Sequence, residues 1–150
     1  MQKKIILFVI IVFLSLRTTA QTVIYNTLLQ DHVSKEGLVD YKNFNQQKLR
    51  LYLTYLEKIT PNSSWSKNRK KAFWINVYNA YTLQIILENY PVKSIRNIKK
   101  SGSIAWKIPF VKVGNKTYTL DHIEHEILRK KYKDPRIHVA VNCGAICCPK

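Results

Sequence analysis

The cysteines are the first candidates for chemistry in this chain. All three lie within a short segment near the C-terminal end, and Cys143 comes first. A cysteine acts as a nucleophile through its thiolate, which requires a nearby base or positive charge. His125 and His138 are the candidate bases. Such a pair would support acyl transfer, with a backbone N–H near Gly144 as a donor to the oxyanion. One functional hypothesis is therefore a cysteine-dependent hydrolase or acyltransferase.

The choice between the two histidines depends on local structure. Residues 137–142 are predicted to form a short buried strand with Cys143 at its end. Because side chains alternate along a strand, His138 and Cys143, five positions apart, would lie on opposite faces. A regular strand therefore favours His125 as the base. A bulge or a break next to Cys143 would favour His138.

The helix predicted over residues 121–131 contains another candidate, Glu124. At 100° per residue, Glu124 falls in the middle of the apolar arc. His125 lies at the border of this arc, whereas His122 and Arg129 point away. An inward carboxylate costs free energy unless it is paired or protonated. Glu124 is therefore either part of a structural ion pair or hydrogen bond, or a group that orients one of the candidate bases or acts as an acid or base itself.

A long helix, expected over about residues 66–89, should form the core. Between positions 72 and 87 apolar residues occur on every side, which is typical of a helix surrounded by protein. Asn76 and Asn79 interrupt this pattern. A buried amide without a partner costs about 1–3 kcal/mol, so each should form hydrogen bonds. These amides would pin neighbouring loops, or Asn79 would orient a catalytic imidazole or an oxyanion.

The cysteines also allow structural interpretations. In an oxidising compartment two nearby thiols form a disulfide by default, which leaves one over. A Cys143–Cys148 bridge would close a small loop with reasonable geometry. A bridge between Cys147 and Cys148 would be strained.

A zinc site is a weaker alternative. His122 and His125 lie three residues apart and could bind zinc together with Cys143 and Cys148. However, His122 is turned by about 200° from the apolar centre of its helix, and no Cys-x-x-Cys pair supports the site. No cofactor is predicted.

The remaining elements predict an α+β fold: a mostly helical single domain with a β-hairpin and the short buried strand. An amphipathic helix is expected over residues 44–59, and Thr60-Pro61 ends it. Residues 108–113 and 116–119 flank Gly114-Asn115, a typical two-residue hairpin turn. With 150 residues, the chain has room for one domain.

Residues 1–20 are predicted to be a signal peptide. Lys3 and Lys4 precede an apolar run from Ile5 to Leu16, and small residues lead to Ala20. As a helix this run would span about 18 Å, too short for a hydrocarbon core of about 30 Å. We therefore expect cleavage near Ala20 and export to the periplasm or the exterior. Residues 21–150 would form the mature domain, without a transmembrane helix.

The chain is strongly basic, with 25 Lys and Arg against nine acids and a formal charge of +16. The basic clusters are dispersed over residues 67–71, 93–100 and 129–133, and no nucleic-acid motif accompanies them, so nucleic acid is not favoured as a partner. They form a solvated surface or bind an anionic glycan, lipid or polymer. The rival hypothesis is therefore a non-catalytic cell-envelope module that binds anionic partners through its basic surface.

Three blocks carry a family resemblance: AFWINVYNAYTLQIILENYPVKSIRNI, YTLDHIEHEILR and DPRIHVAVNCGAICCP. In order and spacing they resemble the domain of unknown function 547 family, from about Val39 to Pro149. The family domain usually continues for several tens of residues past Cys-Pro, so the resemblance implies a C-terminally incomplete domain. It usually has a small or hydroxyl residue where Cys147 stands. The polar motif positions fall on Asn76, Asn79, Glu124, His125, His138, Cys143 and Cys148.

Overall fold

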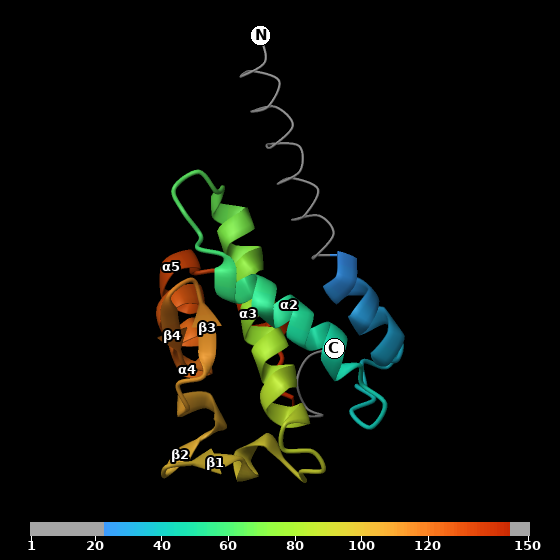
Figure 1. Ribbon diagram of the computed structural model, residues 1–150. Coiled ribbons are helices and arrows are strands. Elements are labelled where there is room, and N and C mark those ends of the chain that lie inside the picture. The colour runs from blue at the N-terminus through green and yellow to red at the C-terminus, as the bar shows by residue number, and fades with distance from the viewer. Residues whose placement is uncertain (1–22, 145–150) are drawn as a thin grey trace.

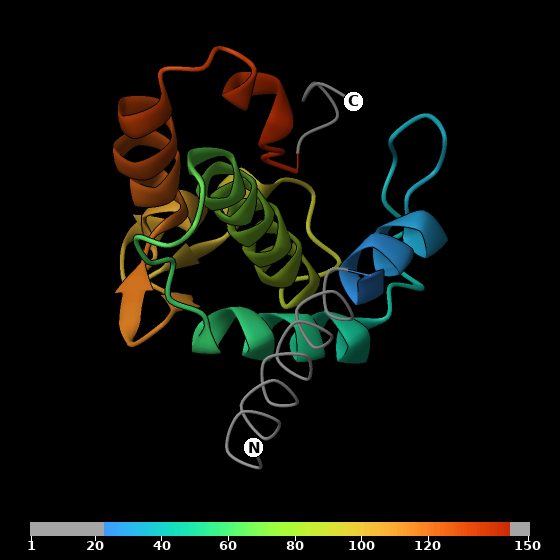
Figure 2. The same cartoon turned by 90° about the horizontal axis from the view of Figure 1, so that it is seen from above.

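The computed structural model describes residues 23–144. The expected signal peptide, Cys147 and Cys148 lie outside these residues. The described chain folds as one domain around α3 (Lys67–Leu87), which runs through its middle (Figure 1). Figure 2 shows α2 (Gln46–Lys58) along one side of α3, with the helix of residues 120–132 and the short α6 (Ile137–Ala140) on other sides. The helix of residues 23–32 lies beside α2.

The two central helices confirm the sequence prediction to within about two residues at each end. The side chain of Asn45 caps α2 by accepting a hydrogen bond from the Lys48 N–H, 3.0 Å away. Ser66 caps α3 in the same way through the Arg69 N–H, at 3.2 Å. As the pattern predicts, α2 buries one face and α3 is buried on all sides. The buried residues of α3 are Trp74, Val77, Tyr78, Ala80, Tyr81, Thr82, Leu83, Ile85, Ile86 and Leu87.

The predicted hairpin is present as the antiparallel pair β3 (Val111–Val113) and β4 (Lys116–Tyr118). Gly114 at the turn has a φ of 57°, and a Cβ there would collide with Thr60. A second antiparallel pair, β1 (Lys99–Lys100) and β2 (Ser103–Ile104), lies between α3 and the hairpin. The 3₁₀ turns η1 (Ile95–Asn97) and η2 (Ala105–Lys107) flank this pair. The fold is thus mostly helical α+β, as expected.

The helix expected over residues 121–131 is a composite of three pieces. It consists of α4 (Leu120–His122), the π-helical η3 (Ile123–Arg129) and α5 (Lys130–Tyr132). Thr119 caps it by accepting a hydrogen bond from the His122 N–H at 3.0 Å. In η3 the hydrogen bonds span five residues, so that the N–H of Lys130 bonds the carbonyl of His125. The turns of η3 are therefore wider than those of an α-helix.

The predicted strand over residues 137–142 is wrong, because α6 occupies Ile137–Ala140. Asp134 starts this helical turn, since its carbonyl accepts from the Ile137 N–H and its side chain from the Arg136 N–H, at 3.1 Å each. Ile137 and Val141 are buried, whereas Val139 is 55% exposed, so burial follows a helical spacing. The β-branched residues indicated a strand, but no described strand lies beside them to pair with. The argument that placed His138 and Cys143 on opposite strand faces therefore no longer applies.

No helix within residues 23–144 is long and apolar enough to cross a membrane.

Candidate functional site

A chain of three side chains joins η3 to α6. The Arg129 guanidinium donates to one oxygen of Glu124, at 2.8 Å from Nη2 and 3.1 Å from Nε. The same Nη2 lies 3.1 Å from Nδ1 of His138. The Glu124 side chain is 16% exposed, so the guanidinium replaces much of the water that would stabilise its charge. The inward carboxylate is thus part of an ion pair, and it reaches His138 through Arg129.

Arg129 is exposed, as the sequence predicted, but its pairing with Glu124 could not be foreseen from an α-helix. In an α-helix, residues five apart differ by about 140° around the axis, which would separate Glu124 from Arg129. The i→i+5 hydrogen bonding of η3 brings such residues close to the same face. The π-helical segment therefore makes the ion pair possible.

The contact with Arg129 also determines where His138 can hold a proton. A guanidinium only donates hydrogen bonds, so Nδ1 of His138 must be the acceptor. The neutral imidazole consequently carries its hydrogen on Nε2. While this contact lasts, His138 has no lone pair available for a thiol proton.

Tyr78 of α3 is a functional candidate that the sequence reasoning missed. Its side chain is fully buried, and its hydroxyl makes no hydrogen bond of ordinary geometry within the described residues. Burial raises the pKa of this hydroxyl well above the usual value, and the nearby negative charge of Glu124 raises it further. Trp106 and Cys143 are also close enough to influence it. The Tyr78 hydroxyl is therefore near enough to Glu124 and Cys143 for their charges to affect it, and it remains a hydrogen-bond donor at physiological pH.

A signal for Tyr78 was present in the sequence. A tyrosine in a helix that is apolar on every side must bury its hydroxyl, and a buried hydroxyl needs a partner. No such signal existed for Trp106, which lies in η2 and reaches this region only through the fold.

Asn79 holds the segment that leads to Cys143 against α3. Its amide nitrogen donates to the carbonyl of Ala140 at 2.9 Å, and its oxygen accepts from the N–H of Asn142 at 2.8 Å. The Asn142 side chain in turn accepts from the N–H of Gly144 at 2.7 Å. Gly144 has a φ of 75°, and a Cβ there would collide with Ile86 of α3. Asn79 thus pins a neighbouring loop, one of the two roles expected for it.

Asn76, its neighbour one turn earlier, has a different partner. Its amide is a hydrogen-bond donor to the hydroxyl of Tyr52 in α2. The burial of Tyr52 raises the pKa of that hydroxyl, and the bond from Asn76 opposes this effect. Asn76 therefore joins the two central helices.

His125 and His122 lie on the exposed side of the composite helix. Nε2 of His125 is 3.7 Å from Oδ1 of Asp121, and the imidazole is 53% exposed. The ring of His122 packs against that of Tyr118, with centroids 5.6 Å apart. His125 is four residues before Arg129 in η3. Its contact with Asp121 and its exposure place the imidazole on the solvent side of the composite helix.

The alternatives for the cysteines involve residues outside the described range. Cys143 is half-buried. Its expected partner Cys148 is not described, so the disulfide stays a prediction. Within residues 23–144 no three histidine, cysteine or acidic side chains gather as metal ligands. The zinc set of His122, His125, Cys143 and Cys148 includes the undescribed cysteine and also stays a prediction.

The fold and the site define a class: a small, mostly helical α+β domain with a polar cluster where its central helix meets a π-helical segment and a short helical turn. The chain belongs to the family described as "Protein of unknown function, DUF547", whose model matches residues 62–150. The match contains the whole cluster but begins after α2, later than the resemblance expected from Val39. Searches of curated proteins and of solved structures find no significant match.

Proposed function

We propose that this protein is an exported cysteine-dependent hydrolase or acyltransferase with Cys143 as its nucleophile. The observation that carries the proposal is the buried Tyr78 hydroxyl, which is close enough to Cys143 to be influenced by its charge and which interacts with Glu124 and Trp106 without a hydrogen bond of ordinary geometry. A buried hydroxyl whose hydrogen bonds are long or poorly aligned is less stabilised than a fully bonded one, which a functional role would explain. An acyl group bound at the sulfur would give this hydroxyl a partner.

In the proposed reaction, the Cys143 thiol gives its proton to His125, and the thiolate attacks the acyl carbon. The carbonyl π electrons move to oxygen, and Tyr78 donates a hydrogen bond to this oxyanion. The bond to the leaving group then breaks, and His125 returns its proton to that group. Water or another nucleophile attacks the resulting thioester with His125 again as base, which restores the thiol.

Two observations favour His125 over His138 as the base. Arg129 occupies the lone pair of His138, as described above. His125 instead faces the carboxylate of Asp121, which would stabilise the imidazolium formed during the reaction. The proposal requires the His125 ring to reach the sulfur from the solvent side. Glu124 and Asn79 then act as positioning residues, because Glu124 contacts Arg129 and Asn79 holds the chain before Cys143.

The sequence suggested a backbone N–H near Gly144 as the oxyanion donor, but the N–H of Gly144 is not available for this role. The N–H of Gly144 itself already donates to the Asn142 side chain. Tyr78 is the alternative donor, because its hydroxyl is close to Cys143 and makes no hydrogen bond of ordinary geometry.

Two thiol reactions of a Cys147→Ser/Cys148→Ser chain test this assignment. Alkylation by iodoacetamide requires only the thiolate, whereas the burst from p-nitrophenyl acetate also requires an oxyanion donor. We expect His125→Ala to slow both reactions by about 10²-fold or more. Tyr78→Phe should slow only the ester reaction, by about 10–10³-fold, because it removes the oxyanion donor and leaves the thiolate unchanged.

His138→Ala is the matched control, and it should affect both rates much less than His125→Ala. Equal rates in the His125 variant and its parent would contradict the assignment of the base. A Cys143 that neither reagent modifies in the folded, reduced protein would contradict the enzyme.

The second candidate function is a non-catalytic module of the cell envelope that binds anionic partners. Its support is the formal charge of +16 on 150 residues. In that case Glu124, Arg129 and Asn79 only stabilise the fold, and Cys143 would be unreactive in the native protein.

A further inference from the structure

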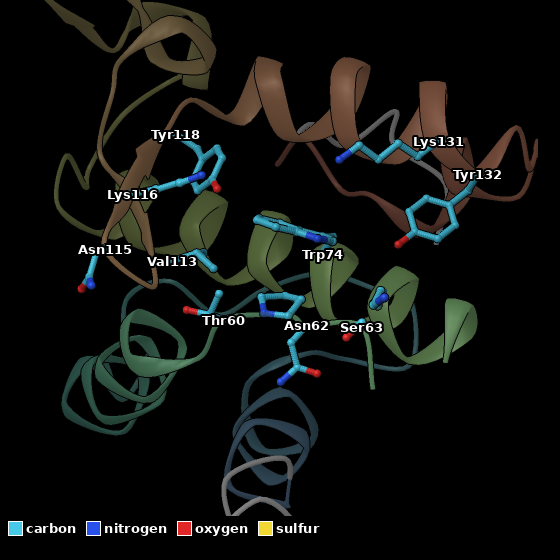
Figure 3. Close-up of a pocket in the computed structure, with 12 residues that line it drawn as sticks. Thr60, Asn62, Ser63, Trp74, Val113, Asn115, Lys116, Tyr118, Lys131 and Tyr132 are labelled. Carbon is cyan, nitrogen blue, oxygen red and sulfur yellow. The ribbon is translucent and has the colours of Figure 1, made fainter. Parts of the chain in front are cut away.

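A separate cavity opens on another side of α3. It has a volume of about 670 Å³, within the range of small-molecule sites. Its walls come from the loop between α2 and α3, from the β3–β4 hairpin and from the end of the composite helix. Figure 3 shows Trp74 in the middle, with Lys131 and Tyr132 on one side and Thr60 and Asn62 on the other. We call it the lysine pocket; its charged residues are Lys70, Lys116 and Lys131.

The charge of the lysine pocket is not compensated. No acidic residue lines it, and within residues 23–144 none of its three lysines forms an ion pair. Their immediate neighbours differ, since Lys71 pairs with Asp134 at 2.7 Å and Lys130 with Glu126 at 2.8 Å. Three positive charges that share one cavity repel each other, so an anion bound there would be stabilised.

The aromatic residues of the pocket indicate the shape of the ligand. Trp74 and Tyr118 meet edge to face, at 74° and 5.4 Å between centroids, so they form no parallel slot for a nucleobase. Trp74 is 8% exposed and presents only part of its ring. The opposite wall carries hydroxyl and amide groups from Thr60, Asn62 and Ser63, which suit a ligand rich in hydroxyls.

We propose that the lysine pocket binds an anionic carbohydrate, namely one or two sugar rings that carry a carboxylate, sulfate or phosphate. The lysines bind the acidic group, the aromatic residues contact the apolar face of a ring, and the opposite wall bonds hydroxyls. The lysine pocket would be the specific site at which the basic surface of the chain binds an anionic partner. The inference does not rest on the chemistry proposed for Cys143, and its failure would leave that chemistry untouched.

The test is an NMR titration of the full chain with D-glucuronate, D-glucose 6-phosphate and D-glucose. The ring is the same in all three, so differences report the acidic group. We expect the indole N–H of Trp74 to shift with both acidic sugars, with an affinity about tenfold or more above that for glucose. Comparing the two acidic sugars distinguishes carboxylate from phosphate recognition. The indoles of Trp65 and Trp106, which do not line the pocket, should shift less.

A pair of double variants separates the pocket from the general basic surface. Lys116→Ala/Lys131→Ala should reduce the affinity for the acidic sugars about tenfold or more, whereas Lys42→Ala/Lys93→Ala should leave it nearly unchanged. All four lysines are exposed, and the second pair lies outside the pocket. Equal losses in both variants, equal binding of glucose and the acidic sugars, or no shift at Trp74 up to high millimolar concentrations would each overturn the proposal.

Discussion

Tyr78 and Asn79 are neighbours in α3, but their polar atoms have different surroundings. The nitrogen of the Asn79 amide donates to the carbonyl of Ala140, and its oxygen accepts from the N–H of Asn142. The hydroxyl of Tyr78 is buried without an ordinary partner. A satisfied amide stabilises a structure, whereas an unsatisfied hydroxyl stores free energy that a ligand can release. We therefore assign Asn79 a role in stabilising the fold and Tyr78 a role in the proposed reaction.

Replacing Asn79 by alanine should lower the free energy of unfolding by about 1–3 kcal/mol, because it leaves a carbonyl and an N–H without their partner. Urea unfolding followed by circular dichroism measures this loss. The control is Asn68→Ala, which removes an exposed amide from the same helix. If both variants lose the same stability, the contacts of Asn79 with the segment before Cys143 contribute nothing.

At the scale of elements, the ends of α3 and α6 are joined by a carboxylate. Asp134 accepts from Arg136 at 2.8 and 2.9 Å and from Lys71 at 2.7 Å. The hydrogen bonds from Arg136, and then that from Lys71, hold the pKa of Asp134 far below its ordinary value of 3.8. The N-terminal part of α3 is thus tied to the turn that starts α6.

This tie predicts a pH dependence of stability. Because the pKa of Asp134 is lower in the folded state than in the unfolded one, its contribution is complete above about pH 4 and is lost progressively as the pH falls below that value. Asp134→Asn should lower the thermal midpoint at pH 7 and make it less dependent on pH between 7 and 2.5. Asp31→Asn, at an exposed carboxylate 3.6 Å from Lys48, is the control with the same charge change. Identical pH profiles for the two variants would contradict this role of Asp134.

A comparison of the helices and strands with the sequence shows which of them could be predicted. Apolar periodicity predicted α2 and α3, and Gly114-Asn115 predicted the hairpin turn, because these features are local. A wheel drawn at 100° per residue placed Glu124 inward and Arg129 outward correctly, but it could not show the i→i+5 bonding of η3 that lets the two side chains pair. Residues 137–142 have a strand-like composition, but the turn at Asp134 determines their helical conformation.

On the scale of the whole molecule, the site depends on contacts that no local pattern carries. Tyr78, Glu124, His138 and Cys143 lie on separate segments, and the sequence proposed three of them without their mutual geometry. The resemblance read from the motifs led to the family whose model matches residues 62–150. The lysine pocket was not foreseen as a cavity, because its lysines come from α3, β4 and α5.

The net charge of the whole chain leads to a further expectation. With a formal charge of +16, self-repulsion should outweigh the few surface ion pairs, so raising NaCl from 10 to about 200 mM should increase stability. The midpoint of urea unfolding is the appropriate measure, because urea adds no ionic strength. A decrease in the midpoint would show instead that the ion pairs dominate.

The contact between Gly144 and α3 has a consequence for the evolution of this chain. Any larger residue at this position would place atoms where Ile86 already lies, and it would also have to adopt a left-handed conformation. The end of the Ile86 side chain could move aside, but the strain of the left-handed conformation would remain at the residue next to the thiol. If the position of the Cys143 sulfur is under selection, the glycine at position 144 should be under selection as well, although it has no side chain.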